Sequence, residues 1–357
     1  MSLRRQSSIS SQTITSSLHT VTLSVLCIFL AIRAELYNKG ISNTAADVIL
    51  QSWRRSTWKQ YNSQLTKFID FCEIRGITWQ QLNTGHVLNF LIKLKDEGLG
   101  YSTISTAKSA IVNFLEILDI NMKESIELKR FMKGLFNFNP PTPKYAQIWD
   151  VRLVTDYLRR TINDDTLLLK EFTIKVALLL ALLSSSRLQT LYNFKFSNMN
   201  IEIEAITFYI CTLLKTSRPN NTGQLVVFHK SEDPALCPVR TILKYREKTS
   251  NLRENKDRFF ICHKKPYAEA SKDTIARWIR TGLSEAGVDT TKFKAHSVRA
   301  AASSSAKLRN VPVDLIMKTA GWRNEHTLNR YYNKPIKFVE NPSFQQALLR
   351  KVDSSTH

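Results

Sequence analysis

The sequence predicts a mainly α-helical protein with a small antiparallel β-sheet, arranged as two domains. Apolar residues recur every three or four positions along most of the chain, and this period is typical of amphipathic helices. The period changes to two only between about residues 201 and 228, which indicates strands. A proline-rich segment, FNFNPPTPK at 136–144, interrupts the pattern, and 357 residues are enough for two cores.

Residues 1–45 are predicted to be an N-terminal extension outside the domains. The segment begins with a Ser/Thr-rich lead, which we expect to be disordered. The apolar stretch Val21 to Ile32 then favours a short helix. Because this stretch is too short to span a bilayer comfortably, a membrane anchor or signal peptide is only a minor alternative.

Residues 46–138 are predicted to form a bundle of four or five helices. Trp58, Tyr61, Leu65, Phe68 and Cys72 follow the helical spacing, as do later apolar residues of the segment. Asn83-Thr84 and Ser102-Thr103 mark helix starts, and the glycines at 76, 98 and 100 mark helix ends. Residues 139–148 follow as a semi-rigid linker, because prolines favour extended backbone.

Residues 149–337 are predicted to form a second, mixed domain. Helices are expected at 151–160, 167–183, 238–249 and 272–286, with Ser271 capping the last of these. Strands are expected at 201–210 and 225–228, on either side of a polar turn. Residues 338–357 are predicted to be a tail with a terminal helix whose apolar side has no evident partner within the chain, which suggests docking on a neighbouring copy.

The charge of the chain points to a polyanionic partner. The formal net charge is +21 and the pI is near 9.8, with basic residues spread along the whole sequence. Nucleic acid is the polyanion that best suits such a distribution. The five cysteines contain no C-x-x-C pair, which argues for a reducing compartment and against both a disulfide framework and a zinc site.

A set of polar residues in the second domain suits phosphoryl transfer. These are His296, Arg299 and the pair Tyr331-Tyr332, in a basic stretch of the sequence. Placing positive charge and hydrogen-bond donors around phosphate oxygens is the main task of a protein in such chemistry. Each residue has an ordinary structural explanation when taken singly, but one mechanism accounts for all of them.

The chain carries Arg187, Lys215, His296, Arg299, Trp322 and a tyrosine in an order that resembles that of the tyrosine recombinase (phage-integrase-like) family. The resemblance covers about residues 56–336, and the helical first half is similar to the core-binding (SAM-like) domain of that family. The residues within the motifs are most similar to those of the recombinases of DIRS-like retroelements and crypton-type transposons. These motifs are RLQTL at 187, LLKTSRP at 213, LCPV at 236, AHSVRAAASSSA at 295 and LNRYYNKP at 328.

The resemblance implies a role for each residue. A tyrosine hydroxyl would attack a scissile DNA phosphate and leave a 3′-phosphotyrosine, so that resealing needs no cofactor. Arg187 and Arg299 would bind the non-bridging oxygens, and His296 would donate to them or help to take the phenolic proton. Lys215 would protonate the departing 5′-oxygen, and Trp322 would donate its indole N–H.

Two positions depart from the usual family pattern. Thr190 stands where many relatives have an acid three residues after the first arginine. The tyrosine is doubled: bacterial-type spacing from Gly321-Trp322 points to Tyr331, whereas the retroelement pattern before Asn-Lys-Pro points to Tyr332. We prefer Tyr332 as the nucleophile and keep Tyr331 as the alternative.

The resemblance implies a site-specific recombinase or integrase that acts on double-stranded DNA as a homo-multimer, a tetramer, in the nucleus. No cofactor, metal or obligatory membrane partner is expected. A type IB topoisomerase and a domesticated DNA-binding protein without catalysis are the alternatives. Arg218, Arg277, Lys292 and Lys294 are candidate contacts to the DNA backbone, and the helix from Lys272 is a candidate groove reader.

Overall fold

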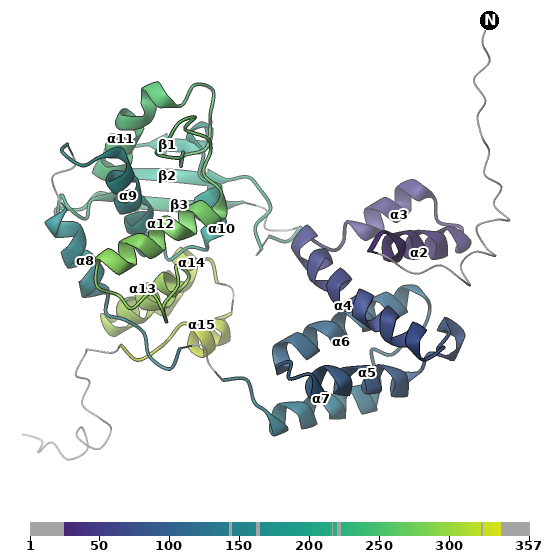
Figure 1. Ribbon diagram of the computed structural model, residues 1–357. Coiled ribbons are helices and arrows are strands. Elements are labelled where there is room, and N and C mark those ends of the chain that lie inside the picture. Colours follow the sequence, from purple (N-terminus) through teal and green to yellow (C-terminus); the bar gives the residue numbers. More distant parts are fainter. Residues whose placement is uncertain are drawn as a thin grey trace, which may run out of the picture. The chain divides into compact units, whose positions relative to one another are not determined.

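The computed structural model describes residues 25–142, 145–161, 165–215, 217–219, 223–322 and 324–336. The chain divides into two compact units, residues 1–142 and 143–357, and each is considered separately below (Figure 1). The described parts are mostly helical with one small sheet, which confirms the predicted fold class. None of the described helices is long and apolar enough to cross a membrane.

The first unit is a bundle of helices around one apolar core. Its elements are α2 (Val25–Asn38), α3 (Asn43–Leu50), α4 (Arg55–Ile74), the 3-10 turn η1 (Trp79–Gln81), α5 (Thr84–Asp96), α6 (Tyr101–Ile117) and α7 (Ile126–Phe138). α6 packs against α4 and α5. Asn83 caps α5 as predicted, and its side chain accepts a hydrogen bond from the amide of His86.

The described part of the predicted N-terminal extension packs within the first unit. α2 and α3 pack into the core of the first unit, where Ile28 and Ile32 are fully buried. Arg33 of α2 pairs with Asp47 of α3 at 2.6 Å. Ile28 and Ile32 of the apolar stretch therefore contribute to this core, and the Ser/Thr-rich lead lies outside the described residues.

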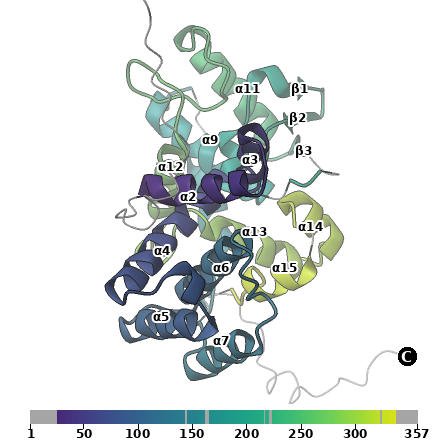
Figure 2. The same cartoon turned by 90° about the vertical axis from the view of Figure 1, so that its right-hand side faces the viewer.

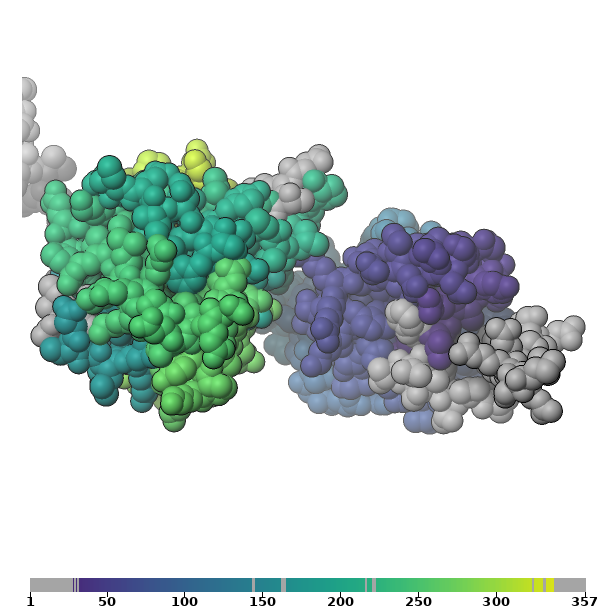
Figure 3. Space-filling view, turned by 90° about the horizontal axis from the view of Figure 1, so that it is seen from above, coloured from purple at the N-terminus to yellow at the C-terminus, as the bar shows by residue number. Residues whose placement is uncertain are grey.

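The second unit has a three-stranded antiparallel sheet covered by helices. The strands are β1 (Met199–Ile201), β2 (Ala205–Ile210) and β3 (Gln224–His229), in the order β1-β2-β3. The helices are α8 (Val151–Arg160), α9 (Leu169–Ser184), α10 (Leu188–Tyr192), α11 (Pro238–Thr249), α12 (Lys272–Glu285), α13 (Ser297–Leu308), α14 (Val313–Ala320) and α15 (Glu325–Tyr331), with 3-10 turns η2 (Phe196–Asn198) and η3 (Ser250–Leu252). Figure 3 shows one face of the second unit, and much of this face is green, the colour that the bar gives to residues around 270.

Helix α9 is the centre of the second core. Its residues from Phe172 to Leu182 are all buried, and α11, α12 and α13 pack around it. Lys175 is buried as well, and its ammonium donates to the carbonyl of Thr161 at 2.9 Å. Because this core fixes α9 on several sides, the turn at its C-terminal end has a defined position.

The predicted linker at 139–148 ends too late. Ile148 is fully buried, pairs with Ile336 in an isolated parallel bridge, and donates its amide to the carbonyl of Pro335 at 2.8 Å. Trp149 is also buried and donates its indole N–H to the hydroxyl of Ser297 at 2.9 Å. The second unit therefore already includes Ile148, since this residue joins its first helix to its last described segment.

A small satellite core joins α13, α14 and α15, which lie together in Figures 1 and 2. It contains Ile316, Ala320, Trp322 and Leu328, with Tyr332 packed against it. The predicted tail at 338–357 lies outside the described residues. The satellite core is the part of the unit in which the last two of the predicted site motifs meet.

Candidate active site

Arg299 is at the centre of the candidate site and is only 1% exposed. Its Nη1 donates to the carbonyl of Ser185 at 2.8 Å and to that of Ala320 at 3.0 Å. Burial, and next the charge of Arg187, lower the pKa of Arg299 to about 10. The two carbonyls fix the orientation of the guanidinium, but they do not neutralise its charge.

Two left-handed turns present these carbonyls. Ser185 follows α9 with a φ of +46°, a conformation that non-glycine residues adopt only at a cost. Its hydroxyl contacts the hydroxyl of Ser303 on α13 at 3.2 Å, which ties the turn to that helix. Gly321 ends α14 with a φ of +66°, where glycine has no steric penalty.

Trp322 and Tyr332 pack at a tilt to each other beside the guanidinium. The Arg299 Cζ lies 4.4 Å from the ring centroid of Trp322 and 5.2 Å from that of Tyr332. The two rings are 4.6 Å apart between centroids. The cation is therefore held next to two aromatic rings, an arrangement that favours a buried positive charge.

Three buried nitrogens of this cluster have no acceptor in hydrogen-bond geometry among the described residues, although the Tyr332 phenol lies near enough to Arg299 to favour its charged form. They are Nε and Nη2 of Arg299 and Nε1 of Trp322. Unpaired buried donors are rare because each costs free energy. A group of them around one cation is suited to binding an anion with several oxygens, such as a phosphate.

His296 connects α13 to the phenol of Tyr332. It is the N-cap residue of that helix, is exposed, and places Nε2 at 3.1 Å from the Tyr332 hydroxyl. Which of the two atoms donates depends on the tautomer of the imidazole. This hydrogen bond allows either proton removal from the phenol or donation towards a ligand oxygen.

The structure brings four of the six predicted site residues into contact, namely His296, Arg299, Trp322 and Tyr332. Arg187 is the N-cap residue of α10, and its charge acts directly on Arg299. Lys215 is exposed on the loop between β2 and β3, and no contact of its ammonium with the cluster is observed among the described residues. The side chain of Tyr331 lies outside the described residues.

Gln189 ties the Lys215 loop to α10. Its Nε2 donates to the carbonyl of Leu213 at 3.2 Å, and its Oε1 accepts from the amide of Lys215 at 3.3 Å. Thr190, the next residue, is buried on the same helix. Sequence reasoning missed Gln189, although its position two residues after Arg187 was the available signal.

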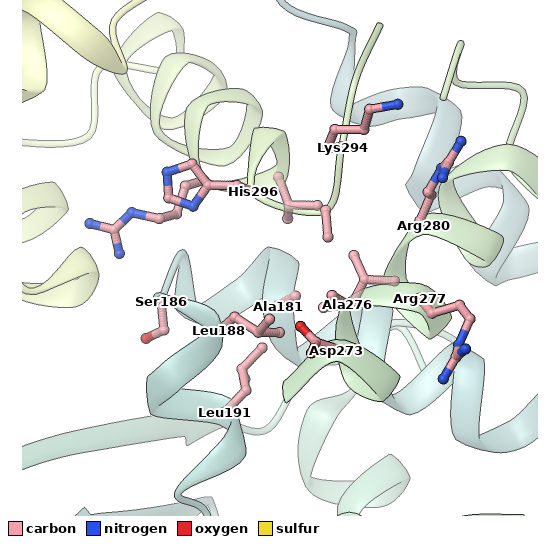
Figure 4. A pocket seen from close by; sticks show the side chains of 14 residues that line it. Ala181, Ser186, Leu188, Leu191, Asp273, Ala276, Arg277, Arg280, Lys294 and His296 are labelled. Carbon is pink, nitrogen blue, oxygen red and sulfur yellow. The ribbon is translucent and has the colours of Figure 1, made fainter. Parts of the chain in front are cut away.

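A cavity of about 590 Å³ adjoins the cluster. Its lining includes His296 and Arg299, and Figure 4 shows apolar side chains such as Leu188 and Ala276 in its middle. Figure 4 shows Arg277, Arg280 and Lys294 on one side of the cavity and His296 on the other, with the carboxylate of Asp273 between them near Leu188. The cavity thus has apolar side chains and one carboxylate in its middle, with a cationic margin across from His296.

Two of the four predicted DNA contacts, Arg277 and Lys294, line this cavity, and the other two do not. Arg218 is exposed and donates to the carbonyl of Ser217 at 3.0 Å, and Lys292 lies 3.8 Å from Asp289. Sequence reasoning missed Arg280. Its spacing of three from Arg277 on α12 places both on one side of the helix.

Family models match most of the chain. Residues 48–119 match the N-terminal SAM-like domain of phage integrases, and residues 158–336 match the phage integrase family. The chain therefore belongs to the phage integrase family. No protein with a curated description matches the chain.

Solved structures of tyrosine recombinases share the fold. XerH site-specific recombinase, bound to its difH substrate before cleavage, matches with a TM-score of 0.60 and 13% identity over 91% of this chain and 86% of that chain. The Tn1549 transposon integrase in complex with circular intermediate DNA matches with a TM-score of 0.54 and 12% identity over 92% of this chain and 98% of that chain. A lambda integrase dimer bound to a COC′ core site matches with a TM-score of 0.52 and 12% identity over 92% of this chain and 81% of that chain. At these identities the likeness concerns the fold alone.

Proposed function

We propose that this protein is a site-specific DNA recombinase or integrase that cleaves and rejoins strands through a 3′-phosphotyrosine formed on Tyr332. The observation that carries the proposal is the set of three unpaired, buried donor nitrogens on Arg299 and Trp322, directly beside a phenol that is hydrogen-bonded to His296. A scissile phosphate supplies the acceptor oxygens that these donors lack. Donors aimed at developing charge are the main source of catalysis in such reactions.

In the proposed reaction, the oxygen of Tyr332 attacks the phosphorus while His296 takes the phenolic proton. Arg187, Arg299 and Trp322 hold the non-bridging oxygens. The bond from phosphorus to the 5′-oxygen breaks, and Lys215 gives that oxygen a proton. Because the phosphodiester energy is kept in the phosphotyrosine, the reverse attack by a 5′-hydroxyl reseals the strand without a cofactor.

Phosphate binding requires a movement of the Tyr332 side chain. The ring of Tyr332 packs at a tilt against Trp322 and lies beside the Arg299 guanidinium, which carries two of the unpaired nitrogens. We infer that the ring swings aside as the phosphate enters and that the phenol then approaches the phosphorus from its new position. His296, exposed at the margin, remains within reach because it begins α13.

The proposed partner is double-stranded DNA, held by phosphate contacts along the cationic margin of the cavity. Arg277, Arg280 and Lys294 supply these contacts across the cavity from His296. Each neutralised phosphate releases counterions, so log Kd should change with log salt by about 0.9 per phosphate contacted. A multimer on DNA, a nuclear location and kinship with DIRS-like or crypton-type elements are further parts of the proposal. The named structures of XerH, lambda integrase and Tn1549 integrase, all with DNA, are consistent with the DNA partner.

The test uses the full chain with a pool of random-sequence duplex DNA, followed by recovery of covalently attached fragments. We expect adduct with the unmodified protein and with Tyr331→Phe, and none with Tyr332→Phe. Adduct that persists in Tyr332→Phe and disappears in Tyr331→Phe would move the nucleophile to Tyr331. The absence of adduct in all three would leave a DNA-binding protein, and relaxation of a supercoiled plasmid without joining of two sites would identify a topoisomerase.

A further inference from the structure

Ser304 makes two hydrogen bonds to the segment that carries Tyr332. Ser304 is on α13 and is 4% exposed. Its hydroxyl donates to the carbonyl of Tyr332 at 2.8 Å and accepts from the amide of Lys334 at 2.9 Å. A serine hydroxyl has a single proton to donate, and here it is given to the residue that we propose as the nucleophile.

The neighbouring serines of α13 behave differently. Ser303 donates to the carbonyl of Arg299 at 2.6 Å, one helical turn back, which is a common local bond for serine in a helix. Ser305 is similarly buried, at 6% exposure, and its hydroxyl makes no hydrogen bond to the described residues. The two bonds of Ser304, by contrast, cross 28 and 30 residues of sequence.

One helix therefore contacts Tyr332 at three levels. His296 reaches the phenol oxygen, Arg299 lies against the ring, and Ser304 holds the backbone. Because α13 packs against α9 in the core, the residues that make these three contacts are held in fixed positions relative to one another. The backbone of Tyr332 is thus a fixed point about which its side chain can rotate.

The chain beyond Lys334 is also attached to its own unit. Pro335 accepts from the amide of Ile148, and Ile336 pairs with Ile148. Tyr332, Lys334 and Pro335 are therefore hydrogen-bonded to α13 or to the segment before α8, and Ile336 lies paired with Ile148. A tyrosine donated to a neighbouring copy would have to break all of these bonds.

We propose that Ser304 is a positioning residue that holds the backbone of Tyr332 beside the donors of its own chain. This inference rests on the proposed function, because it assumes that Tyr332 attacks the phosphate. It assigns to the Ser304 hydroxyl the task of fixing where the tyrosine backbone sits. Misplacement of a reacting group by about 1 Å can slow a reaction about a hundredfold.

The first test compares Ser304→Ala with Ser305→Ala, a matched change on the same buried helix. With the random duplex pool, we expect Ser304→Ala to form covalent adduct about ten- to a hundredfold more slowly, at unchanged DNA affinity. Ser305→Ala should stay within about twofold of the unmodified protein. Ser304→Thr, which keeps the hydroxyl, should recover most of the rate.

Equal adduct rates in Ser304→Ala and Ser305→Ala would overturn the proposal. So would a Ser304→Thr variant as slow as Ser304→Ala, because the hydroxyl would then be irrelevant. Amide hydrogen exchange at Lys334 provides a readout that does not depend on activity. Ser304→Ala should speed this exchange and Ser305→Ala should not, and unchanged exchange in both would overturn the proposal even if the unmodified protein formed no adduct.

The second test mixes two inactive full-length variants. Tyr332→Phe keeps the donors and lacks the nucleophile, whereas Arg299→Ala keeps the nucleophile and lacks the central donor. If each chain uses its own tyrosine, the mixture forms no more adduct than either variant alone. Restored adduct in the mixture would show that the tyrosine acts on a neighbouring copy, while the absence of adduct in the unmodified protein would count against the proposed function itself.

Discussion

The two sides of the proposed site are built in opposite ways. Arg299 is buried, and backbone carbonyls from two separate turns fix its guanidinium. Lys215 is exposed, and the contacts observed for it hold its backbone through Gln189. The difference suggests that phosphate binding is prepared before DNA arrives, whereas the proton donor reaches its place only when DNA is bound.

The buried side carries a cost that a ligand would remove. Desolvation and the nearby charge of Arg187 lower the pKa of Arg299, and two of its nitrogens have no acceptor in hydrogen-bond geometry among the described residues. A buried cation without an anion is unfavourable. A phosphate entering this cluster would offset both the charge and the unmet hydrogen bonds, whereas the exposed Lys215 has water around it and no such deficit.

The largest effect is expected from a change on the buried side. Arg299→Lys keeps the charge but loses the planar fork of donors, so covalent adduct formation should fall by about a hundred- to a thousandfold. Arg309→Lys, at the exposed C-terminal end of the same helix, is the matched control and should change the rate little. An Arg299→Lys variant within a few fold of the unmodified protein would mean that the guanidinium does not bind the reacting phosphate.

The exposed side should respond to the chemistry of the leaving group. Lys215→Ala should slow adduct formation on ordinary DNA by about a hundredfold, as for loss of a general acid. On DNA in which sulfur replaces the 5′-bridging oxygen, the rate should recover, because a thiolate leaves without a proton. Arg299→Lys should stay slow on both substrates. Lys230→Ala, exposed after β3 and paired with Glu204, is the control, and equal slowing of Lys215→Ala on both substrates would assign Lys215 to phosphate binding instead.

In the absence of DNA, phosphate binding should distinguish the two sides of the site, because variants on each side should differ in how much phosphate raises their thermal stability. Inorganic phosphate at about ten times its Kd should stabilise the protein by about 1.4 kcal/mol, or a few degrees in Tm. Lys215→Ala should keep this shift and Arg299→Lys should lose most of it. The measurement is thermal unfolding over a phosphate titration, with chloride at matched ionic strength as the control. An equal shift in both variants would place the anion elsewhere on this basic surface.

The sequence predicted the second unit better than the N-terminal segment. Helix α8 begins and ends where predicted, because Asp150 caps it and its apolar spacing is regular. The apolar stretch from Val21 predicts a short helix, but periodicity does not reveal which core a helix joins. Only the fold shows Ile28 beside α4 and α6. In the site, motif order placed Arg299 and Tyr332 together. Gln189 and Ser304 stand in the motifs RLQTL and AHSVRAAASSSA, but their side chains contact backbone groups, and only the fold shows which ones.

The smallest effect is expected at Gln189, where the two sides of the site meet. Gln189→Ala removes the two bonds that tie the Lys215 loop to α10, next to Arg187. Because the variant keeps the Lys215 ammonium and loses only the bonds that position its loop, the rate of adduct formation on ordinary DNA should fall by only about tenfold. The sulfur-bridged substrate should abolish this loss, since it needs no proton donor. If Gln189→Ala instead slows both substrates alike, the amide supports Arg187 and the phosphate-binding side, and the boundary between the two sides lies on the Lys215 loop rather than on α10.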